Sequence, residues 1–506
     1  MPKKLPIFYS ALLLTGVNLL LRLVGTSFQV YISGRIGAAG VGLLQLTMSV
    51  GSLAMVTGIA GVRTATMYLT AEELGKKRPG NVTWVLSGCF VYSILCSTAV
   101  AAALYFLAPA LAENWIGDVR TVNSLRLFAA FLPVSCLCGV MTGYFTAANR
   151  IGTLAAVEAA EQLCSMVVTM AVLTLWAGDD PGRACQSVVM GGCFGACLTL
   201  CCLMLLRLAE RVKPGPKIPI RSRLLQAAVP LAMADVLKSG INTTENLMVP
   251  KRLALNSLID SPLAAFGIVS GMVFHVLMFP ACILFGLAEL LIPELARCAA
   301  AGSKQRISYL VRRSLRAAML YGIVFSGLEF LLAEGLCSSL YHNAEAGRWL
   351  RLYALLIPML YCDAITDAMT KGLGQQKVCV RYNIITNFMD VLFLYFLLPK
   401  YGMQGYFFSF FVTHLVNFVL SLRRLLIITG ETIPFSVPAL SVAAAIAAGW
   451  GASHFSSPVL RAGTYPVLLG CLMCLFGVLG REDIAWLKGL FRGKTVSNVR
   501  SFSKSA

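Results

Sequence analysis

The chain has 506 residues, of which 58% are hydrophobic and 13% are charged, and its net charge is +19. With a mean hydropathy of +0.76, it has too little polar surface to cover itself in water, which excludes a soluble globular protein. We therefore expect an integral membrane protein. Its basic residues are concentrated in loops on one side of the membrane, so the positive charge is interpreted as an orientation signal and not as a nucleic-acid site.

About 14 apolar stretches near or above the roughly 20 residues needed to cross a bilayer follow one another along the chain. The expected spans are residues 6–33, 38–69, 82–108, 122–147, 153–177, 185–208, 224–248, 262–296, 309–336, 347–372, 379–399, 403–427, 434–455 and 462–480. They are long and continuous, and they lack the alternation of apolar and polar residues found in membrane strands. The predicted fold is therefore an all-α membrane protein.

The second half of the chain repeats the first at an offset of 225 residues. Residues 125–129 (LRLFA) recur as residues 350–354 (LRLYA), and Gly42 and Gly267 fall at the same offset, as do Gly61 and Gly286. Duplicated helix bundles are common in transporters that open alternately to the two sides of a membrane. Because each copy holds an even number of spans, we expect the copies to be related by an axis along the membrane normal.

The repeat also predicts the domain boundaries. We expect an N-terminal six-helix bundle at residues 1–212 and a C-terminal six-helix bundle at residues 213–428. An additional transmembrane helix pair is expected at 429–480, followed by a cytoplasmic tail at 481–506. The two bundles and the helix pair are expected to surround a central cavity.

The basic residues predict the orientation of the chain. Assigning alternate loops to alternate sides places about 29 Lys and Arg on the side of both termini and about 10 on the other. The N- and C-termini are therefore expected in the cytoplasm, and the chain is expected to be a multi-pass protein of the cell membrane. The same residues would contact anionic lipid head groups.

Two spans carry polar residues along one helical face. On the first span these residues are Thr15, Asn18, Arg22, Thr26 and Gln29. On the seventh span, which begins the second copy, they are Asp235, Lys238, Asn242 and Glu245. Ionisable residues at membrane depth usually face a cavity or a partner, and corresponding helices of two related copies can line one central cleft. We expect both stripes to line this cleft, with Asn18, Arg22 and Gln29 of the first stripe contacting the substrate and the second stripe contacting it or closing the gate.

Arg22 and Arg63 are the candidate anion contacts. Arg22 has no carboxylate at helical spacing on its own span, and Arg63 lies in the second span. A guanidinium recognises phosphate through paired hydrogen bonds. For Asp235 and Lys238 the alternative interpretation is a structural ion pair between residues three positions apart.

Four further residues are candidates for an ion site or a gate. Asp363 and Asp367 are four residues apart on the tenth span, and Asn387 and Asp390 are aligned on the eleventh. Such a set would line either a cation site or the interior of the second bundle.

Several motifs are absent from the sequence: a Walker A pattern, a dinucleotide glycine fingerprint, HExxH and GxSxG. We therefore expect that the chain is not an enzyme and has no cofactor. A proton or sodium gradient, the membrane potential or the substrate supply would drive it. Most of the 17 cysteines fall inside apolar spans, so we interpret them as buried apolar residues and expect no metal site.

Five stretches and the 14-span plan carry a resemblance to a known family. The stretches are residues 22–25 (RLVG), 34–42 (GRIGAAGVG), 58–73, 246–253 (NLMVPKRL) and 286–296. In these the chain resembles the multidrug/oligosaccharidyl-lipid/polysaccharide (MOP) flippase superfamily, and within it the polysaccharide biosynthesis and stage V sporulation protein B branch. The resemblance covers essentially the whole chain.

The resemblance implies a flippase that moves a lipid-linked cell-wall precursor or oligosaccharide, of undecaprenyl-diphosphate type, from the inner to the outer leaflet by alternating access. Arg22 matches the first-helix arginine of related lipid II flippases. Where those relatives have a further arginine two turns later, this chain has Phe28 and Gln29, so Arg63 and Arg35 are the candidates to replace it. The implied partners are the lipid-linked glycan and membrane lipids, the last two helices would hold the prenyl tail, and a monomer is expected.

Two other functions stay open. A cation-coupled multidrug exporter of the same superfamily needs an acidic site within one bundle, but the first bundle has almost no buried acid away from its ends. A membrane glycan polymerase or ligase needs a sizeable outer loop with catalytic residues, but the outer breaks are short. The flippase is therefore favoured.

Overall fold

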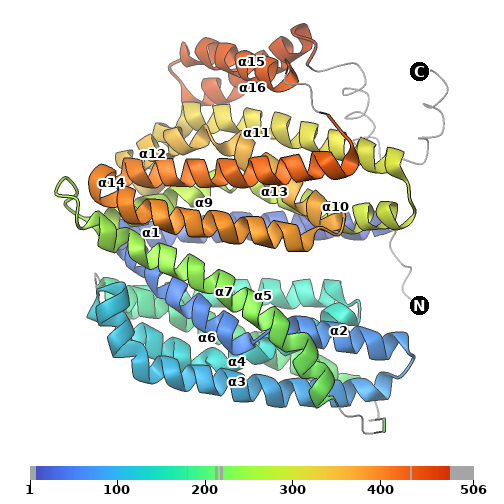
Figure 1. Cartoon of the computed structure of the whole chain (residues 1–506). Helices are drawn as coiled ribbons and strands as arrows, with labels where there is room; N and C mark the ends of the chain where they lie inside the picture. Colours follow the sequence, from blue (N-terminus) through green and yellow to red (C-terminus); the bar gives the residue numbers. More distant parts are fainter. Residues whose placement is uncertain (1–6, 179, 211–214, 217–219, 433–435, 479–506) are drawn as a thin grey trace. The chain divides into compact units, whose positions relative to one another are not determined.

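The computed structural model describes residues 7–178, 180–210, 215–216, 220–432 and 436–478, and these contain helices and turns but no strand (Figure 1). Nine of their helices are long and apolar enough to cross a membrane, or up to 11 if each of two bent pairs is one span. The predictions of an all-α fold and of a multi-pass membrane protein are confirmed.

The chain folds into two compact units. The first comprises residues 1–283, 340–342 and 380–417. Its main helices are α1 (Ile7–Ile59), α2 (Val62–Gly75), α3 (Val82–Ala110), α4 (Val122–Ala147), α5 (Ile151–Val172), α6 (Pro181–Ala209), α7 (Arg221–Leu253), α8 (Pro262–Gly267), α9 (Phe274–Leu277) and part of α14 (Gln376–Thr429). This unit includes residues on both sides of position 212, where the repeat predicts the boundary between the two bundles. The boundary stays a prediction.

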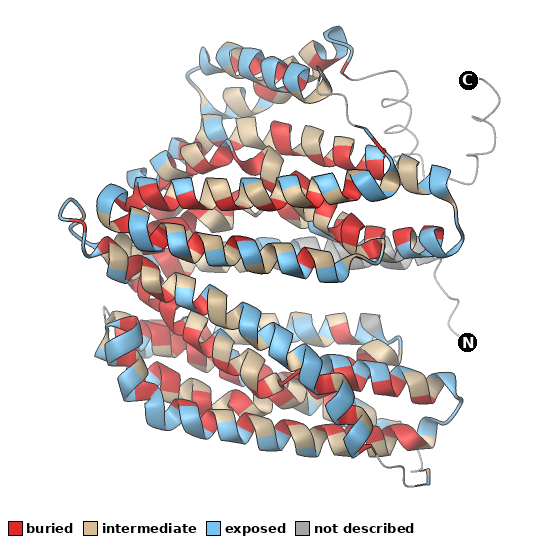
Figure 2. Ribbon diagram, in the orientation of Figure 1, coloured by how far each residue is buried: buried red, intermediate tan, exposed pale blue. Residues whose placement is uncertain are grey.

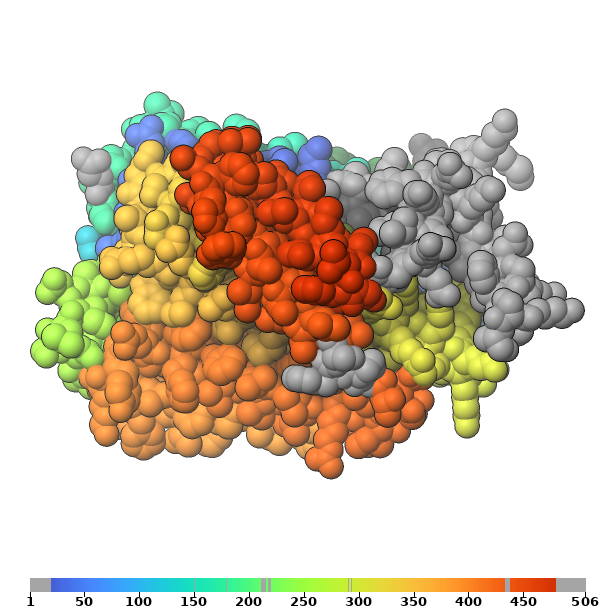
Figure 3. All heavy atoms as spheres, turned by 90° about the horizontal axis from the view of Figure 1, so that it is seen from above, coloured from blue at the N-terminus to red at the C-terminus, as the bar shows by residue number. Residues whose placement is uncertain are grey.

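The second unit comprises residues 284–339, 343–379 and the described residues from 418 onward. Its helices are most of α10 (Ala281–Ala300), α11 (Lys304–Tyr341), α12 (Ala344–Ala354), α13 (Ile357–Gly372), the end of α14, α15 (Ser436–Ser453) and α16 (Pro458–Leu475). Two helices, α15 and α16, lie within the range predicted for the trailing pair, and they lie side by side (Figures 1 and 3). They pack on α11, where the Tyr465 hydroxyl donates to the Ile323 carbonyl at 3.1 Å.

The long helix α14 contains two of the predicted spans, and α1 contains the first and most of the second. Gly37 in α1 and Gly402 in α14 have positive φ angles of 67° and 56°. This left-handed conformation interrupts the helix at little steric cost only in glycine. Both glycines lie between predicted spans, so the sequence placed these junctions correctly.

Three spans predicted as continuous are interrupted. The second is divided between α1 and α2 by Ala60 and Gly61, which have positive φ. The eighth breaks at residues 278–280, where Pro280 supplies no backbone donor. The tenth consists of α12 and α13, bent by 57°, and Pro358 stands in the first turn of α13. Apolar content continues across these breaks, which is why hydropathy did not reveal them.

Exposed residues recur along the membrane-spanning helices (Figure 2), and many of them are large and apolar. On α3, Leu95, Phe106 and Leu107 are more than half exposed. Large apolar surfaces of this kind are unfavourable in water but suit contact with lipid chains.

Two glycines that are equivalent in the repeat meet where α1 crosses α8. A Cβ atom on Gly267 would lie 2.6 Å from the backbone nitrogen of Gly42 and 3.0 Å from its Cα. A Cβ atom on Gly42 would in turn collide with the carbonyl of Leu263. Small residues allow membrane helices to approach this closely. Equivalent residues of two copies meet in this way at a two-fold axis, so the crossing fits the predicted symmetry.

We expect the substitution Gly267→Ala to lower stability by about 1–3 kcal/mol, because the added methyl group would overlap fixed backbone atoms. The measurement is the thermal unfolding midpoint of the purified protein in detergent. Gly34→Ala is the control, because no atom lies near its Cβ position. Equal midpoints for the two variants would show that the crossing is not tight.

Candidate functional site

A polar cavity in the first unit is lined by residues of four helices, of which α2, α7 and α14 supply the charged and amide groups. Its volume is about 470 Å³. The charged and amide residues that line it are Arg63 on α2, Asp235, Lys238 and Asn242 on α7, and Asn387 on α14. The first four are predicted substrate contacts, and Asn387 belongs to the predicted ion or gate set. The cavity therefore brings together members of both sets.

The junction between α1 and α2 places Arg63 at the cavity. Ala60 and Gly61 have φ angles of 45° and 72°, so α2 starts anew at Val62 and Arg63 lies in its first turn. A Cβ atom on Gly61 would collide with the carbonyl of Ala228 on α7. Glycine at this position therefore allows both the turn and the close approach of α7.

Three residues of the α7 stripe face the cavity, whereas the fourth, Glu245, does not line it. Asp235, Lys238 and Asn242 are all exposed and line the cavity. Within the described chain, neither Asp235 nor Lys238 forms an ion pair, so the alternative of a mutual structural pair is not supported. With Arg63, the lining carries two cationic groups and one carboxylate. This charge excess suits an anionic group, and the remaining polar atoms suit hydroxyl groups.

The stripe on α1 faces a different neighbour. The Gln29 amide donates to the carbonyl of Gly271 at 3.3 Å, so this side chain joins α1 to the segment between α8 and α9. Arg22 is exposed and interacts electrostatically with His275 of α9. Neither Arg22 nor Gln29 lines the cavity. The side chain of Asn18 lies outside the described residues.

A pair of carboxyl groups, one buried and one half-buried, lies one turn further along α7 and α14. The carboxyl group of Glu245 on α7 lies beside that of Asp390 on α14, close enough for the two to interact, and Asp390 is only 6% exposed. Ser409 and Thr413 donate their hydroxyls to Asp390 Oδ1 at 2.5 Å and 3.3 Å. Two carboxyl groups this close cannot both carry a negative charge unless a cation lies between them. The cluster can therefore hold a proton or a small cation.

The acidic pair and the cavity share two helices. Asn242 lies one turn before Glu245 on α7, and Asn387 lies one turn before Asp390 on α14. A change of charge at the pair therefore acts on the elements that form the cavity wall. Glu245, predicted as a substrate contact, is placed by the structure with Asp390.

The other predicted ion or gate residues lie in the second unit. Asp363 and Asp367 are one turn apart on α13. Asp367 pairs with Lys371 at 2.5 Å, so it neutralises a residue on its own helix. The predicted set of four is thus divided between the two units and does not form one site within either of them.

Sequence reasoning missed Ser409 and Thr413. They are four residues apart on the twelfth predicted span, and this spacing was the available signal. The signal is weak because hydroxyls in apolar helices commonly bond to their own backbone. Thr413 also does so, to the carbonyl of Ser409 at 2.9 Å. In the described parts of the chain, no group of three or more His, Cys, Asp and Glu side chains is arranged to hold a metal ion.

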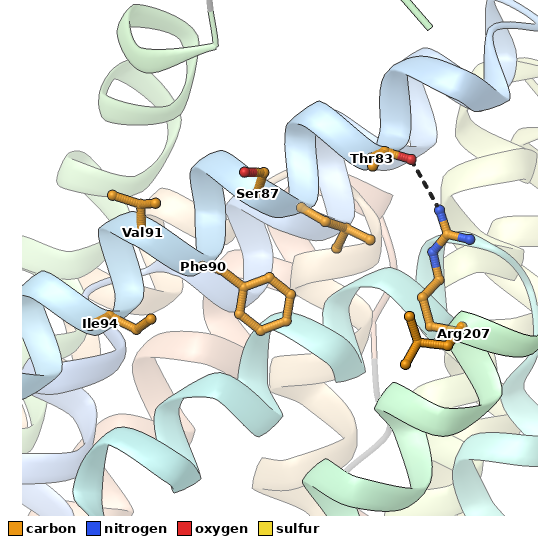
Figure 4. A pocket seen from close by; sticks show the side chains of 8 residues that line it. Thr83, Ser87, Phe90, Val91, Ile94 and Arg207 are labelled. Carbon is orange, nitrogen blue, oxygen red and sulfur yellow. Dashed lines mark hydrogen bonds between the residues drawn. The ribbon is translucent and has the colours of Figure 1, made fainter. Parts of the chain in front are cut away.

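A second hollow of the first unit, between α3 and α6, has a volume of about 590 Å³ (Figure 4). Phe90, Val91 and Ile94 make it largely apolar. The guanidinium of Arg207 donates to Thr83 at 3.4 Å and pairs with Glu210 at 3.1 Å. Because its one cation is already neutralised, this hollow is a poorer anion site than the α2/α7/α14 cavity.

Comparison with known proteins gives consistent matches. The family model for polysaccharide biosynthesis proteins matches residues 38–259, and the MatE model matches residues 230–396. Stage V sporulation protein B of Bacillus subtilis (strain 168) is 20% identical over 411 residues, which cover 78% of each chain.

Solved structures match over most of the chain. The lipid II flippase MurJ in an inward closed conformation has a TM-score of 0.69 at 14% identity, covering 92% of this chain and 98% of that one. A multidrug resistance transporter of the MATE family, in its inward-facing conformation, has a TM-score of 0.64 at 13% identity, covering 83% and 100%. At these identities the structures establish a shared fold.

We expect a cysteine in Asn242→Cys to react with a charged, membrane-impermeant methanethiosulfonate reagent, because this position lines the cavity. The adjacent Thr243→Cys is the control, because Thr243 is buried at 2% exposure and should react several-fold more slowly. Peptide mass spectrometry measures the modification of each position separately from the native cysteines. Equal rates at the two positions would contradict a water-filled cavity on this face of α7.

Proposed function

This chain belongs to the MOP superfamily of membrane transporters, and we propose that it is a flippase for a lipid-linked cell-wall precursor or oligosaccharide of undecaprenyl-diphosphate type. The observation that carries the proposal is the α2/α7/α14 cavity, in which Arg63 and Lys238 outnumber the single carboxylate of Asp235. An anionic head group is favoured in such a cavity, whereas a cationic drug is not.

The lining residues have distinct chemical roles in this proposal. The Arg63 guanidinium donates paired hydrogen bonds to a diphosphate, and the Lys238 ammonium adds a point charge. Asp235 and Asn242 accept and donate hydrogen bonds to sugar hydroxyls. A volume of about 470 Å³ lies within the roughly 300–1,000 Å³ typical of ligand pockets, so we assign it to the diphosphate and the first sugar.

Arg22 is proposed as a further anion contact. It is exposed on α1, but in this conformation it lies outside the cavity lining. If it meets the head group in another conformation of the transport cycle, Arg22→Ala will weaken translocation without closing the cavity.

The Glu245–Asp390 pair is proposed as the site that couples transport to a proton or sodium gradient. Binding or release of a cation changes the charge between α7 and α14, which also form the cavity wall. Such a change favours one arrangement of the helices over the other, as rocker-switch transport requires.

The same observations bear on the two alternative functions, a multidrug exporter and a membrane enzyme. A cation-coupled multidrug exporter would also use the acidic pair and has the same fold, but the cationic cavity lining opposes it. The comparisons match a flippase and a multidrug transporter, which confirms the expectation that the chain is not an enzyme. Location in the cell membrane, with both termini in the cytoplasm, is part of the proposal.

The proposal is tested by leaflet translocation in vesicles containing the purified protein, with a fluorescent prenyl-diphosphate glycan compared with a cationic dye. The glycan lipid should move and the dye should not. Arg63→Gln should weaken the apparent affinity about ten- to a hundredfold, because a lost charge-assisted hydrogen bond costs about 1.5–3 kcal/mol.

Arg78→Gln is the matched control, since Arg78 is exposed in the turn after α2 and should leave the affinity unchanged. Transport of the dye but not of the glycan lipid would establish the exporter instead. Equal behaviour of the Arg63 and Arg78 variants would remove Arg63 from the site.

The coupling role predicts that Asp390→Asn abolishes stimulation of transport by an imposed proton or sodium gradient. An amide cannot take up a proton or supply a negative charge, so the rate should fall to that measured without a gradient. Asp260→Asn, at an exposed loop position, should keep the stimulation. Undiminished stimulation in Asp390→Asn would place the coupling site elsewhere.

A further inference from the structure

The second unit contains a cavity that the proposed function does not use. It has a volume of about 660 Å³ and lies between α11, α13, α14 and α15. Its lining is mostly apolar and includes Met319, Ile323, Phe418, Leu422, Leu426 and Val442. The charged lining residues are Arg312 and Arg316, and among the described residues no acidic side chain lines it.

The two arginines stand where α11 changes from basic to apolar. All lysines and arginines of α11 fall within residues 304–316, and the helix is largely apolar from residue 317 onward. Basic residues at such a boundary lie at the level of the lipid head groups. The apolar part of the cavity lining is thus placed at the depth of the acyl chains.

Neighbouring groups orient both guanidiniums at this boundary. Arg312 pairs with Glu431, which also accepts a hydrogen bond from Ser308. Arg316 donates to the carbonyl of Val478. These contacts fix the guanidiniums beside the cavity, and neither the Glu431 carboxylate nor the Val478 carbonyl is one of its lining groups.

We propose that this cavity binds one anionic phospholipid, with an acyl chain among the apolar side chains of α11, α14 and α15 and the phosphate on Arg312 and Arg316. A guanidinium fork matches phosphate oxygens, and a basic pocket between membrane helices suits an anionic head group. The predicted orientation places the start of α11 on the cytoplasmic side, where anionic lipids concentrate.

The hollow between α3 and α6 provides a comparison for the charge of this proposed phosphate site. Its volume is similar, at about 590 Å³, and an arginine lies at one end (Figure 4). That arginine, Arg207, donates to Glu210 and to Thr83, which itself lines the hollow. Arg312 pairs with Glu431 in the same way, but the cavity of the second unit has a second arginine, Arg316, so it presents more positive charge to a phosphate.

A bound phospholipid would join helices that are distant in sequence. Its chain would contact α11, α14 and α15 at once, and it would bind the folded protein but not the unfolded chain. Ligands of this kind raise the unfolding temperature. The inference does not depend on which molecule is transported, because the residues and the unit differ from those of the α2/α7/α14 cavity.

Native mass spectrometry of the purified full-length protein tests the proposal, with palmitoyl-oleoyl phosphatidylglycerol compared with the zwitterionic phosphatidylcholine of the same chains. The protein should retain one phosphatidylglycerol, and its unfolding temperature should rise with that lipid alone. The double variant Arg312→Gln/Arg316→Gln should bind it at least about tenfold more weakly, as expected when charge-assisted hydrogen bonds are lost.

Arg306→Gln is the control, since Arg306 is on the same helix, is 65% exposed and pairs with Glu294. It should retain the lipid as the unsubstituted protein does. Because the double variant also loses the contact with Glu431, Leu422→Trp provides a second test. It fills the apolar part, leaves both arginines in place and should also lose the lipid.

Three outcomes would overturn the proposal. Equal retention of phosphatidylcholine would show that charge does not select the lipid. Equal loss in Arg306→Gln would show a diffuse surface attraction. Displacement of phosphatidylglycerol by an equal concentration of undecaprenyl phosphate would show that the cavity belongs to a prenyl carrier.

Discussion

The close crossing of α1 and α8 at Gly42 and Gly267 is the contact on which the arrangement of the first unit depends. Neither position has room for a Cβ atom, because backbone atoms of the other helix occupy that space. In a membrane, where the surrounding lipid is as apolar as the side chains, such close packing supplies much of the attraction between helices. The two glycines occupy equivalent positions in the repeat, so the repeat places a glycine on each side of the contact.

A second close approach extends this arrangement to the cavity. Gly61 ends the α1 segment and admits α7 against it, and this brings Arg63 to the same cavity as Asp235 and Lys238. Charged side chains are costly in the hydrocarbon region unless water or a partner reaches them. A cavity between α2, α7 and α14 meets that requirement, and the acidic pair behind it meets the same requirement by sharing a proton or a cation.

The sequence was sufficient to predict the features that depend on a single helix, such as its apolar length and the spacing of its polar residues. Long apolar runs predicted the spans, Gly37 and Gly402 fell at predicted junctions, and the spacing of the α7 stripe placed Asp235, Lys238 and Asn242 on the face that lines the cavity. Features that depend on a neighbouring helix were less accessible. Periodicity placed Arg22 and Gln29 on one face but did not show that this face meets residues 268–277.

The same limit explains the acidic pair. Glu245 and Asp390 were each identified, but on separate spans and with different roles, because their proximity depends on how α7 packs against α14. Ser409 and Thr413 gave no signal that distinguished them from hydroxyls bonded to their own helix. Pro280 and Pro358 broke spans that hydropathy joined, since hydropathy does not register a missing backbone donor.

The most informative single measurement is a cryo-electron microscopy structure of the protein in lipid nanodiscs with a prenyl-diphosphate sugar bound. We expect diphosphate density between Arg63 and Lys238, with the first sugar beside Asp235 and Asn242. Ordered substrate density at another site, with the α2/α7/α14 cavity filled only by water, would contradict the assignment of this cavity to the transported head group.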